Sequence, residues 1–370
     1  MKTEIKFMRL ALRLAKRGSG ATSPNPMVGA VLVKSGKIIG RGWHRRAGLP
    51  HAEIEALRDA QKRGRNPRDA TLYVTLEPCC THGRTPPCTD AIISAGIKKV
   101  VIGATDPNPK HTGKGFRILR RAGIEVVHGI LDGECAKLNE TFNHWIVHRT
   151  PFVTVKAAMT LDGKIATAGG ESKWITGEKA RKHAMRLRQG SDAVLVGINT
   201  ILADNPNLTA RSRNKKQLRR IILDSMARTP LNAKVVSDEF AGLTTIVAGK
   251  SAPKKRVKDL AEKVNVVIAP TANAKLDLKW LLKKLGAENV TGLLVEGGGE
   301  VNASFLFGGF AQRAAFFYAP KVLGGRDARK AVAGDGAKNL SAAIQLLEIE
   351  WKQIGGDLLM TALVANGAKK

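Results

Sequence analysis

The sequence predicts an α/β protein made of two domains. Its 370 residues exceed what a single hydrophobic core usually serves, which favours two domains. Short apolar segments alternate with single helical patterns, as expected for a mostly parallel sheet covered by helices. The alternation is interrupted at 148–151, where a helical pattern stops and a new strand follows Pro151. We therefore expect the domains to span 1–148 and 149–370.

The elements of the first half follow from apolar spacing and turn residues. Ile5, Met8, Leu12 and Ala15 are spaced as one face of a helix, and Gly64 is a typical helix stop. The predicted helices are 4–17, 52–64, 89–96 and 115–123, followed by a helical pattern over 134–147. The predicted strands are 28–33, 37–44, 70–78, 98–106 and 124–129, and the first two form a hairpin.

The second half again alternates, and it contains a glycine-rich turn. Its predicted strands are 152–160, 193–197, 220–225, 244–249, 264–269, 292–298 and 314–320. No G-x-G-x-x-G motif follows the first strand; instead GLLVEGGGEVNASFL joins a late strand to a helix through Gly297, Gly298 and Gly299. Glycine lets the backbone approach an anion closely, and a helix start offers free N–H groups. This turn is therefore a candidate phosphate site.

The chain is strongly basic, with 61 Lys and Arg against 31 Asp and Glu, a formal net charge of +30. Such an excess fits nucleic-acid binding, or a basic surface with anion sites for phosphorylated small molecules. The basic runs 213–216 and 254–256 have no aromatic residues between them, whereas a platform for single strands needs such residues. We therefore expect no nucleic-acid partner.

Two features bear on location. No apolar run approaches the ~20 residues of a membrane span, so no membrane partner is expected. The first helical pattern begins at once and leaves no room for a signal peptide, which predicts a cytoplasmic protein.

Three of the four cysteines lie within ten positions, and in a reducing compartment this clustering indicates metal ligation rather than disulfides.

The stretches PHAE and EPCCTHGRTPPC contain a candidate zinc site. Cys79 lies at the carboxyl end of a predicted strand, the edge where open α/β sheets bind ligands, and His51 and Cys88 each begin a helix. Two thiolates and one imidazole suit Zn²⁺ and leave a fourth position for water, whose pKa the metal lowers towards ~7. Glu53 is placed to move a proton from that water to a leaving amine.

The spacing matches a zinc deaminase in part. His51 and Glu53 form the H-x-E motif, and Pro78 with Cys79 forms the P-C motif of these enzymes. The second cysteine is displaced, because eight residues instead of two separate Cys79 from Cys88. We predict a zinc deaminase. Nearby groups that we do not expect to bind the metal are Cys80, His82, Cys135, His44 and His111.

Longer motifs resemble one family closely. SPNPMVGAVLV, PHAEIEAL, TLEPCCTHGRTPPCTDAI and DPNPKHTGKG resemble the deaminase half of the bifunctional riboflavin-biosynthesis deaminase–reductases. KAAMTLDGKIATAGGESKWITG, NTILADNPNLTAR and VEGGGEVNASFL resemble the reductase half. The resemblance covers almost the whole chain in the family's domain order. It implies an N-terminal cytidine-deaminase-like α/β/α domain and a C-terminal dihydrofolate-reductase-like α/β domain.

The resemblance implies two consecutive reactions on a phosphorylated pyrimidine. The first is zinc-dependent hydrolytic deamination of 2,5-diamino-6-ribosylamino-4(3H)-pyrimidinone 5′-phosphate. The second is NADPH-dependent reduction of the ribosyl side chain to ribityl. The family pattern gives one zinc ion per chain, held by His51, Cys79 and Cys88. It makes Glu53 the catalytic proton shuttle and Asn25 a contact to the ring.

The resemblance also implies contacts in the second half, with the cofactor pyrophosphate over 298–304. The residues that match cofactor positions are Ala158, Trp174, Thr200, Asp204, Ser225, Gly298, Gly299, Glu300, Val301, Asn302, Ala303 and Ser304. The residues that match substrate positions are Ser172, Arg188, Leu208, Arg211 and Glu296. Arg188 and Arg211 are suited to a substrate phosphate, because guanidinium groups form charge-assisted and bidentate hydrogen bonds.

Other interpretations remain open at this point. A nucleic-acid deaminase of the tRNA type with an accessory domain would use the basic surface, but it would want the short P-C-x-x-C spacing. A zinc-stabilised binding module would not need Glu53. A chain with only one working half is a third possibility, although neither half shows an obvious lesion. We expect the functional form to be a homo-oligomer, a dimer or a tetramer.

Overall fold

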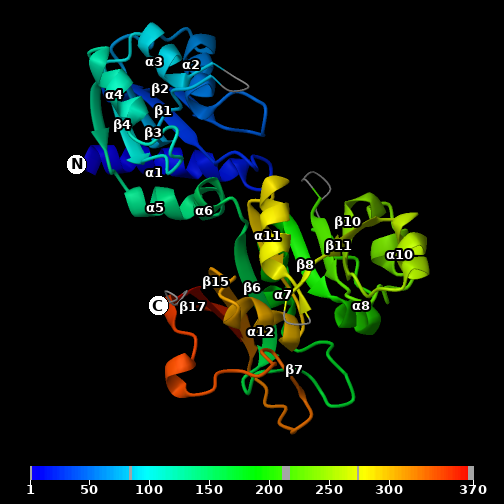
Figure 1. The fold of residues 1–370 in the computed structure, drawn as a ribbon. Helices are drawn as coiled ribbons and strands as arrows, with labels where there is room; N and C mark the ends of the chain where they lie inside the picture. The colour runs from blue at the N-terminus through cyan, green and yellow to red at the C-terminus, as the bar shows by residue number, and fades with distance from the viewer. Residues whose placement is uncertain (1, 83–85, 211–216, 273–274, 366–370) are drawn as a thin grey trace. The chain divides into compact units, whose positions relative to one another are not determined.

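The computed structural model describes residues 2–82, 86–210, 217–272 and 275–365. The chain divides into two compact units, Met1–Arg149 and Thr150–Lys370, which are described separately below (Figure 1). Each unit is built on its own sheet. None of the helices in the described ranges combines the length and the apolar character that a membrane crossing requires.

Unit 1 contains a five-stranded sheet in the order β2-β1-β3-β4-β5. Its strands are β1 (Gly29–Lys34), β2 (Lys37–Trp43), β3 (Thr71–Leu76), β4 (Lys99–Ala104) and β5 (Glu125–His128). Its helices are α1 (Lys2–Ala15), α2 (Ala52–Lys62), α3 (Cys88–Ser94), α4 (Lys114–Arg121), α5 (Asp132–Leu138) and α6 (Glu140–His148). The strands and the first four helices predicted for this half are therefore confirmed, with ends that differ by a few residues.

The sheet of unit 1 is less parallel than the sequence indicated. Strands β3, β4 and β5 are parallel, but β1 is antiparallel to both of its neighbours, β2 and β3. The hairpin between β1 and β2 forces this reversal, because a two-residue turn joins only antiparallel strands. The connection from β2 through α2 then passes over β1, so that β3 runs in the same direction as β2.

The single helical pattern predicted over 134–147 is two helices, α5 and α6, which meet at Asn139. This buried side chain accepts a hydrogen bond from the Met27 amide at 2.8 Å and donates one to the Met27 carbonyl at 2.9 Å. Asn139 is 2 % exposed, so its amide group is committed to the backbone of another segment. The break redirects the chain and lets α6 turn towards the start of β1.

Helix α2 lies unusually close to β2. Side chains at Gly40 and Gly42 would meet the backbone carbonyl oxygens of Ala56 and Ala52. The two glycines therefore allow the helix backbone to rest directly on the strand, where any larger residue would push the helix away. This contact fixes the start of α2, which is where His51 and Glu53 are located.

Unit 2 contains a nine-stranded sheet in the order β11-β10-β9-β8-β14-β6-β15-β18-β17. These strands are β6 (Phe152–Thr160), β8 (Ala193–Gly197), β9 (Arg219–Leu223), β10 (Thr244–Gly249), β11 (Asn265–Ala269), β14 (Gly292–Val295), β15 (Arg313–Ala319), β17 (Leu346–Ile354) and β18 (Asp357–Val364). Short strands β7 (Lys164–Ala166) and β16 (Arg329–Lys330) pair with each other, as do β12 (Thr271–Ala272) and β13 (Lys275–Leu276). All neighbouring strands from β11 to β15 are parallel.

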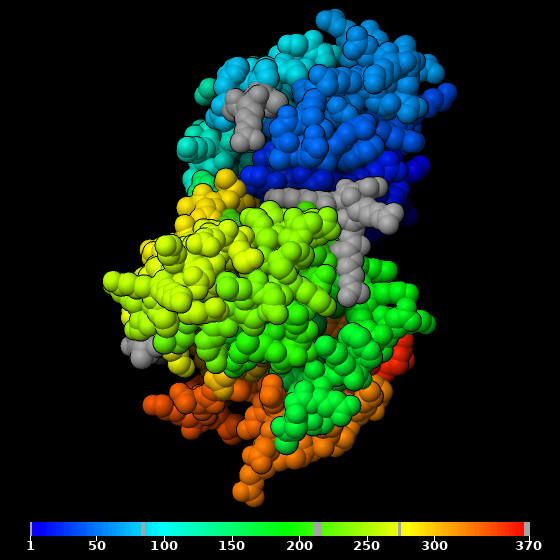
Figure 2. All heavy atoms as spheres, turned by 90° about the vertical axis from the view of Figure 1, so that its right-hand side faces the viewer, coloured from blue at the N-terminus to red at the C-terminus, as the bar shows by residue number. Residues whose placement is uncertain are grey.

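Helices cover both faces of this second sheet (Figure 1). The helices of the unit are α7 (Glu178–Gln189), α8 (Ile198–Asp204), α9 (Lys234–Ser237), α10 (Lys254–Ala261), α11 (Leu278–Ala287) and α12 (Gly299–Phe307). One apolar cluster joins the sheet to α11 and α12, and separate clusters join its other face to α8 and α10 and to α7. Figure 2 looks onto the α10 edge of the unit, where the yellow-green residues around 250 face the viewer.

The sequence predicts no strand after residue 320, but the structure has the antiparallel hairpin β17–β18 there. It extends the sheet beyond β15 through antiparallel pairing of β18. Leu347, Ile349 and Trp351 alternate with charged residues, a period-two pattern that indicates a strand. The hairpin leaves β17 as an edge strand with exposed apolar side chains, and a bulge between Leu347 and Glu350 interrupts its regular pairing with β18.

We predict that Gly42→Ala displaces α2, because the new methyl group would overlap the backbone at Ala52. Overpacking of this kind costs roughly 3 kcal/mol when backbone must move. The expected result is a lower urea midpoint for the unfolding of unit 1 and a reduced metal content after purification. Gly133→Ala is the matched control, because a side chain at Gly133 meets nothing within 4 Å. If Gly42→Ala matches that control in both measurements, the close approach does not constrain α2.

Candidate functional site

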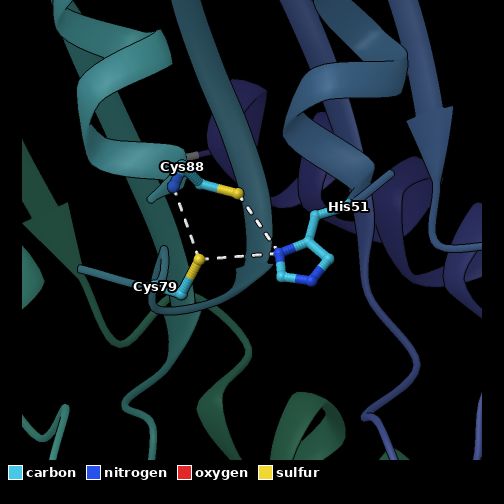
Figure 3. A group of neighbouring side chains, drawn as sticks. All are labelled: His51, Cys79 and Cys88. Atoms are coloured by element: carbon cyan, nitrogen blue, oxygen red, sulfur yellow. Dashed lines mark hydrogen bonds between the residues drawn. The ribbon is translucent and has the colours of Figure 1, made fainter. Parts of the chain in front are cut away.

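The three candidate metal ligands meet at the carboxyl end of β3 (Figure 3). His51 precedes the first residue of α2, Cys79 follows β3, and Cys88 is the first residue of α3. His51 Nδ1 lies 3.5 Å from Cys79 Sγ and 3.3 Å from Cys88 Sγ. The Cys88 amide donates to Cys79 Sγ at 3.4 Å, and all three ligand atoms lie within 4.8 Å of one another. The sequence prediction that these residues converge is confirmed.

The geometry and the charges fit a zinc ion. Ligand bonds of ~2.0–2.3 Å at tetrahedral angles put nitrogen and sulfur ligands about 3.5 Å apart, which the measured distances match. A hydrogen bond from Cys88 and the neighbouring His51 lower the pKa of Cys79 to about 4 against the effect of burial. A hydrogen bond to Cys79 and burial raise the pKa of Cys88. A divalent cation bound here would replace the proton of that thiol.

The buried side chain of Glu53 also indicates that a ligand binds at this site. The side chain lies in the first turn of α2 and is only 3 % exposed. Its Oε2 atom is buried and has no hydrogen-bond partner among the described residues. Burial raises the pKa of Glu53 to about 7, although His51 acts in the opposite direction. A carboxyl group that exchanges a proton near neutral pH is what general acid–base chemistry requires.

His51, Cys79 and Glu53 line a cavity of about 300 Å³ in unit 1. Asn25, predicted to contact a ring, also lines it, and its Nδ2 atom lies 3.2 Å from Nε2 of His44. His44 Nδ1 lies 3.1 Å from the carbonyl oxygen of Pro50, which can only accept, so Nδ1 carries the proton. Burial lowers the pKa of His44, so its ring is neutral and Nε2 accepts from Asn25. The Asn25 carbonyl oxygen therefore remains available to a ligand.

The cavity has two walls that sequence reasoning missed. Asp106, Asn108 and His111 come from the connection after β4, and Phe142, Trp145 and Ile146 come from α6. The DPNP stretch follows a strand parallel to β3, and both strands end at the same edge of the sheet. This shared edge could have predicted from the sequence that the DPNP stretch lines the cavity. The apolar wall had no local signal, because α6 reaches the cavity only through the break at Asn139.

We expected the other cysteines and histidines near this site to have structural roles and not to bind the metal. Cys80 points towards His111 rather than the metal cluster, with Sγ 3.7 Å from Nδ1 of His111. Cys135 is 1 % exposed and belongs to the apolar core. His44 and His111 are exceptions, because both line the cavity.

A second cavity, of about 330 Å³, lies in unit 2 and contains a buried ion pair. Arg188 donates from Nε and Nη2 to the two carboxylate oxygens of Glu296 at 2.9 and 2.7 Å. Burial acts to raise the pKa of Glu296, but the charges of Arg188 and Lys156 outweigh it and the pKa is lowered. Lys156, which sequence reasoning missed, lines the same cavity, and burial lowers its pKa.

A third cavity, of about 800 Å³, adjoins the second and runs past the glycine-rich turn. Both cavities are lined by Ser172, Thr200, Asp204 and Gly298. A side chain at Gly298 would meet nothing within 4 Å, so the backbone there is open to a ligand at the start of α12. This cleft and its helix start suit the phosphates of a dinucleotide cofactor.

Most of the predicted cofactor and substrate residues lie in these two cavities. Those that line at least one of them are Ala158, Ser172, Trp174, Arg188, Thr200, Asp204, Leu208, Glu296, Gly298, Gly299, Glu300 and Val301. Those outside both linings are Ser225, Asn302, Ala303 and Ser304. Asn302 donates to the Ala331 carbonyl and Ser304 to that of Glu300, so their side chains serve the fold. Arg211 lies outside the described residues.

Comparison with known proteins identifies both halves. Residues 1–104 match the family described as the cytidine and deoxycytidylate deaminase zinc-binding region, and residues 151–360 match the RibD C-terminal domain. The riboflavin biosynthesis protein RibD of Actinobacillus pleuropneumoniae is 44% identical over 98% of this chain and 96% of its own length. The RibD protein of Aquifex aeolicus is 47% identical over 96% of both chains.

Solved structures agree with these matches. RibD of Acinetobacter baumannii superposes with a TM-score of 0.87 at 37% identity, over 98% of this chain and 99% of that one. A Thermotoga maritima protein described as diaminohydroxyphosphoribosylaminopyrimidine deaminase/5-amino-6-(5-phosphoribosylamino)uracil reductase superposes with a TM-score of 0.84, also at 37% identity and with the same coverage. The two domain types expected from the sequence are therefore confirmed.

We predict that only two of the three neighbouring cysteines are needed for zinc. Cys79→Ser and Cys88→Ser should each lower the zinc content of the purified protein well below one ion per chain, because each removes a thiolate ligand. Cys80→Ser should keep about one ion per chain, because its sulfur faces His111. Elemental analysis by mass spectrometry measures the content. Zinc loss in the Cys80 variant alone would show that the wrong sulfur has been assigned.

Proposed function

Because this chain belongs to the RibD family of riboflavin biosynthesis proteins, we propose that unit 1 carries out deamination and unit 2 carries out reduction. The enzyme is bifunctional, a zinc-dependent deaminase and an NADPH-dependent reductase of riboflavin biosynthesis. The alternative of a tRNA-type deaminase is set aside, because relatives of the same length and domain order are RibD proteins.

In the deaminase we assign His51, Cys79 and Cys88 as the zinc ligands and Glu53 as the proton shuttle. The clustered ligand atoms and the buried Oε2 atom of Glu53, which has no partner among the described residues, support this assignment. Zinc supplies an activated water molecule when it is bound. Glu53 accepts one proton from the attacking water and delivers it to a ring nitrogen, and it then carries the second proton of that water to the departing amino group. The carbon–nitrogen bond breaks, ammonia leaves, and a carbonyl group takes its place on the pyrimidinone.

Asn25 is assigned as a ring contact in the same cavity. Its hydrogen bond to His44 leaves the carbonyl oxygen free, so it accepts from an N–H group of the substrate. The apolar wall of Phe142, Trp145 and Ile146 provides a flat surface for the ring and excludes water. The substrate class is therefore a phosphorylated pyrimidine whose ring enters the cavity.

In the reductase we assign the cleft over Gly298 and Gly299 to the cofactor and the cavity at Glu296 to the ribosyl group. NADPH supplies a hydride when it is bound. The cofactor contacts and the substrate contacts are those predicted from the sequence, including Arg211. The role of Arg188 differs from the predicted one, because its guanidinium group already binds the carboxylate of Glu296. Its Nη1 donates to the Thr209 carbonyl. Arg188 thus orients Glu296 and reaches the substrate only through its remaining N–H groups.

We propose that the enzyme works as a homo-oligomer through β17. Leu347, Ile349 and Trp351 are 53%, 52% and 61% exposed on this edge strand. A long apolar edge is a template for pairing with another strand, and a second copy of the chain would bury it. We also propose a cytoplasmic location, because all four cysteines are free and the zinc thiolates must stay reduced.

We predict that Glu53→Gln keeps zinc but releases ammonia about 10²- to 10⁴-fold more slowly, the usual loss when a general acid–base is removed. The substitution preserves size and leaves the three ligands in place. Ammonia release is followed with the diaminopyrimidine substrate, and zinc content is measured in parallel. Turnover within a factor of two of the wild type would exclude the proposed role.

The same variant separates the two halves. When given the deaminated intermediate, Glu53→Gln should oxidise NADPH at the wild-type rate, because Glu53 lies in unit 1 and the reductase cavity lies in unit 2. Absorbance at the nicotinamide band reports this step. A matching loss of NADPH oxidation with the fold intact would contradict the assignment of separate sites.

We predict that Ile349→Lys together with Trp351→Lys dissociates the oligomer, because two buried charges would oppose pairing of β17. Sedimentation velocity should then give the mass of one chain, 39.7 kDa, for the variant and a multiple of it for the wild type. Leu340→Lys is the control, because Leu340 is 92% exposed but lies in a turn before the hairpin. A monomeric wild type would rule out the oligomer, and an unchanged mass in the double variant would rule out this interface.

A further inference from the structure

The segment 205–210 follows α8 and lines the second cavity. It contributes Pro206 and Leu208 to the same lining as Glu296. The segment contains no helix or strand, and Asn205 and Leu208 have positive φ values of 41° and 53°. Residues other than glycine keep this conformation only where their surroundings impose it. Contacts from other elements must therefore fix the shape of this segment.

Three side chains from neighbouring elements donate hydrogen bonds to carbonyl oxygens of the segment. The bonds run from Arg220 Nη1 to Asn207 at 3.1 Å, from Arg188 Nη1 to Thr209 at 3.2 Å and from Gln189 Nε2 to Ala210 at 3.3 Å. The first two flank Leu208, which is only 3 % exposed. The backbone on both sides of Leu208 is therefore held from outside the segment.

Arg220, in β9, uses all of its N–H groups within the protein. The side chain is 1 % exposed, and Nη1 and Nη2 bind the two carboxylate oxygens of Asp238 at 2.7 and 2.8 Å. Nε donates to the Thr244 hydroxyl at 2.8 Å, and Nη2 also donates to the Val235 carbonyl at 3.1 Å. With the bond to Asn207 these are five hydrogen bonds, as many as a guanidinium group can donate. Arg220 thus has no donor left for a ligand.

A buried ion pair is a costly way to fill a core, because apolar residues of similar volume are often as stabilising or more so. Arg220 provides what an apolar residue cannot, a donor directed at the Asn207 carbonyl. The bidentate bond to Asp238 fixes the plane of the guanidinium group and hence the direction of that donor. Asp238 follows α9, whose Lys234 amide donates to Asn205 Oδ1 at 2.9 Å. The α9 region therefore supports the segment at its start as well.

The segment in turn supports the ion pair of the cavity. The Thr209 carbonyl accepts from Nη1 of Arg188, whose Nε and Nη2 bind Glu296. A shift at Asn207 would carry Thr209, two residues later, out of this arrangement. It would also move Leu208, which lies between them and lines the cavity. Two groups of the substrate cavity therefore depend on the same anchor.

We propose that Arg220 is a positioning residue for substrate binding in the reductase. It holds the segment 205–210, so that Leu208 and the Arg188–Glu296 pair meet the ribosyl substrate in one arrangement. This inference rests on the proposed assignment of reduction to unit 2. The competing explanation is that the buried pair with Asp238 only stabilises unit 2 as a whole.

Substrate kinetics and cofactor binding, measured on the full-length protein, test the proposal. Arg220→Lys keeps a positive charge beside Asp238, but a single ammonium nitrogen cannot make the five directed bonds of the guanidinium group. The KM for the deaminated intermediate should rise about 10- to 100-fold, because the cavity wall is displaced. The Kd of NADPH, measured by nicotinamide fluorescence, should stay within about twofold, because the glycine-rich turn lies on other elements.

Arg219→Lys is the matched control. Arg219 precedes Arg220 in β9, points to the opposite face of the sheet and donates to Glu288 at 2.6 Å. It keeps its charge in the variant and is not among the residues that line the second or third cavity. Both the KM and the Kd of NADPH should therefore stay within about twofold of the wild type.

A double variant tests whether Arg220 acts through the segment. Leu208→Ala removes the side chain that the segment presents to the cavity. In this background the KM penalty of Arg220→Lys should shrink at least about threefold, because part of what Arg220 positions is already gone. Asp238→Asn, which keeps one acceptor oxygen, replaces Arg220→Lys if that variant does not fold. It should raise the KM about 3- to 10-fold, again without a change in NADPH binding.

The inference is overturned if Arg220→Lys raises the KM no more than Arg219→Lys does. It is also overturned if the KM and the Kd of NADPH rise together, or if the penalty is undiminished in the Leu208→Ala background, because a general loss of stability produces these results. Failure of the reductase assignment gives a different result, in which the wild type does not oxidise NADPH when given the deaminated intermediate.

Discussion

The convergence of two helix starts on one strand end is the constraint on which unit 1 depends. His51 and Cys88 begin α2 and α3, and Cys79 follows β3, so three ligands from distant segments meet at one edge of the sheet. Gly40 and Gly42 let α2 pack directly on β2, and this contact fixes the distance of His51 and Glu53 from the sheet. The same edge receives the loop after β4. Metal, proton shuttle and ring recognition are therefore consequences of how the sheet is covered.

The site of unit 2 is built from different groups than the site of unit 1. No metal cluster appears among its described residues; a buried Arg188–Glu296 pair and Lys156 take its place beside a glycine-rich helix start. Burying one of these charges alone would be costly, whereas the bidentate pair keeps Glu296 ionised and oriented. The polar centre is thus fixed before cofactor or substrate enters, which is what a hydride transfer needs from its protein.

Sequence reasoning found the parts that are local. The spacing of His51, Glu53 and Cys79 carries the metal chemistry, and strand–helix alternation carries most of the fold. It missed what depends on tertiary contacts. The amide exchange between Asn139 and Met27 splits a helical pattern into α5 and α6 and brings Trp145 to the cavity. Predicting that Asp106 lines the cavity would have required the pairing of β3 with β4. Predicting the hydrogen bonds between Arg188 and Glu296 would have required the positions of both residues in space.

The acidity of the deaminase cavity bears on the basic surface. Cys79 and the carboxyl groups of Glu53, Glu77 and Asp106 line it, and Cys88 completes the metal cluster beside it, so its interior is rich in acidic groups. A phosphate group would be repelled from such an interior, and the cavity of about 300 Å³ is sized for a ring. The ribosyl phosphate must therefore point outward when the pyrimidinone is bound. An excess of 61 basic over 31 acidic residues then attracts the phosphorylated substrate to a protein whose deaminase interior would repel its phosphate.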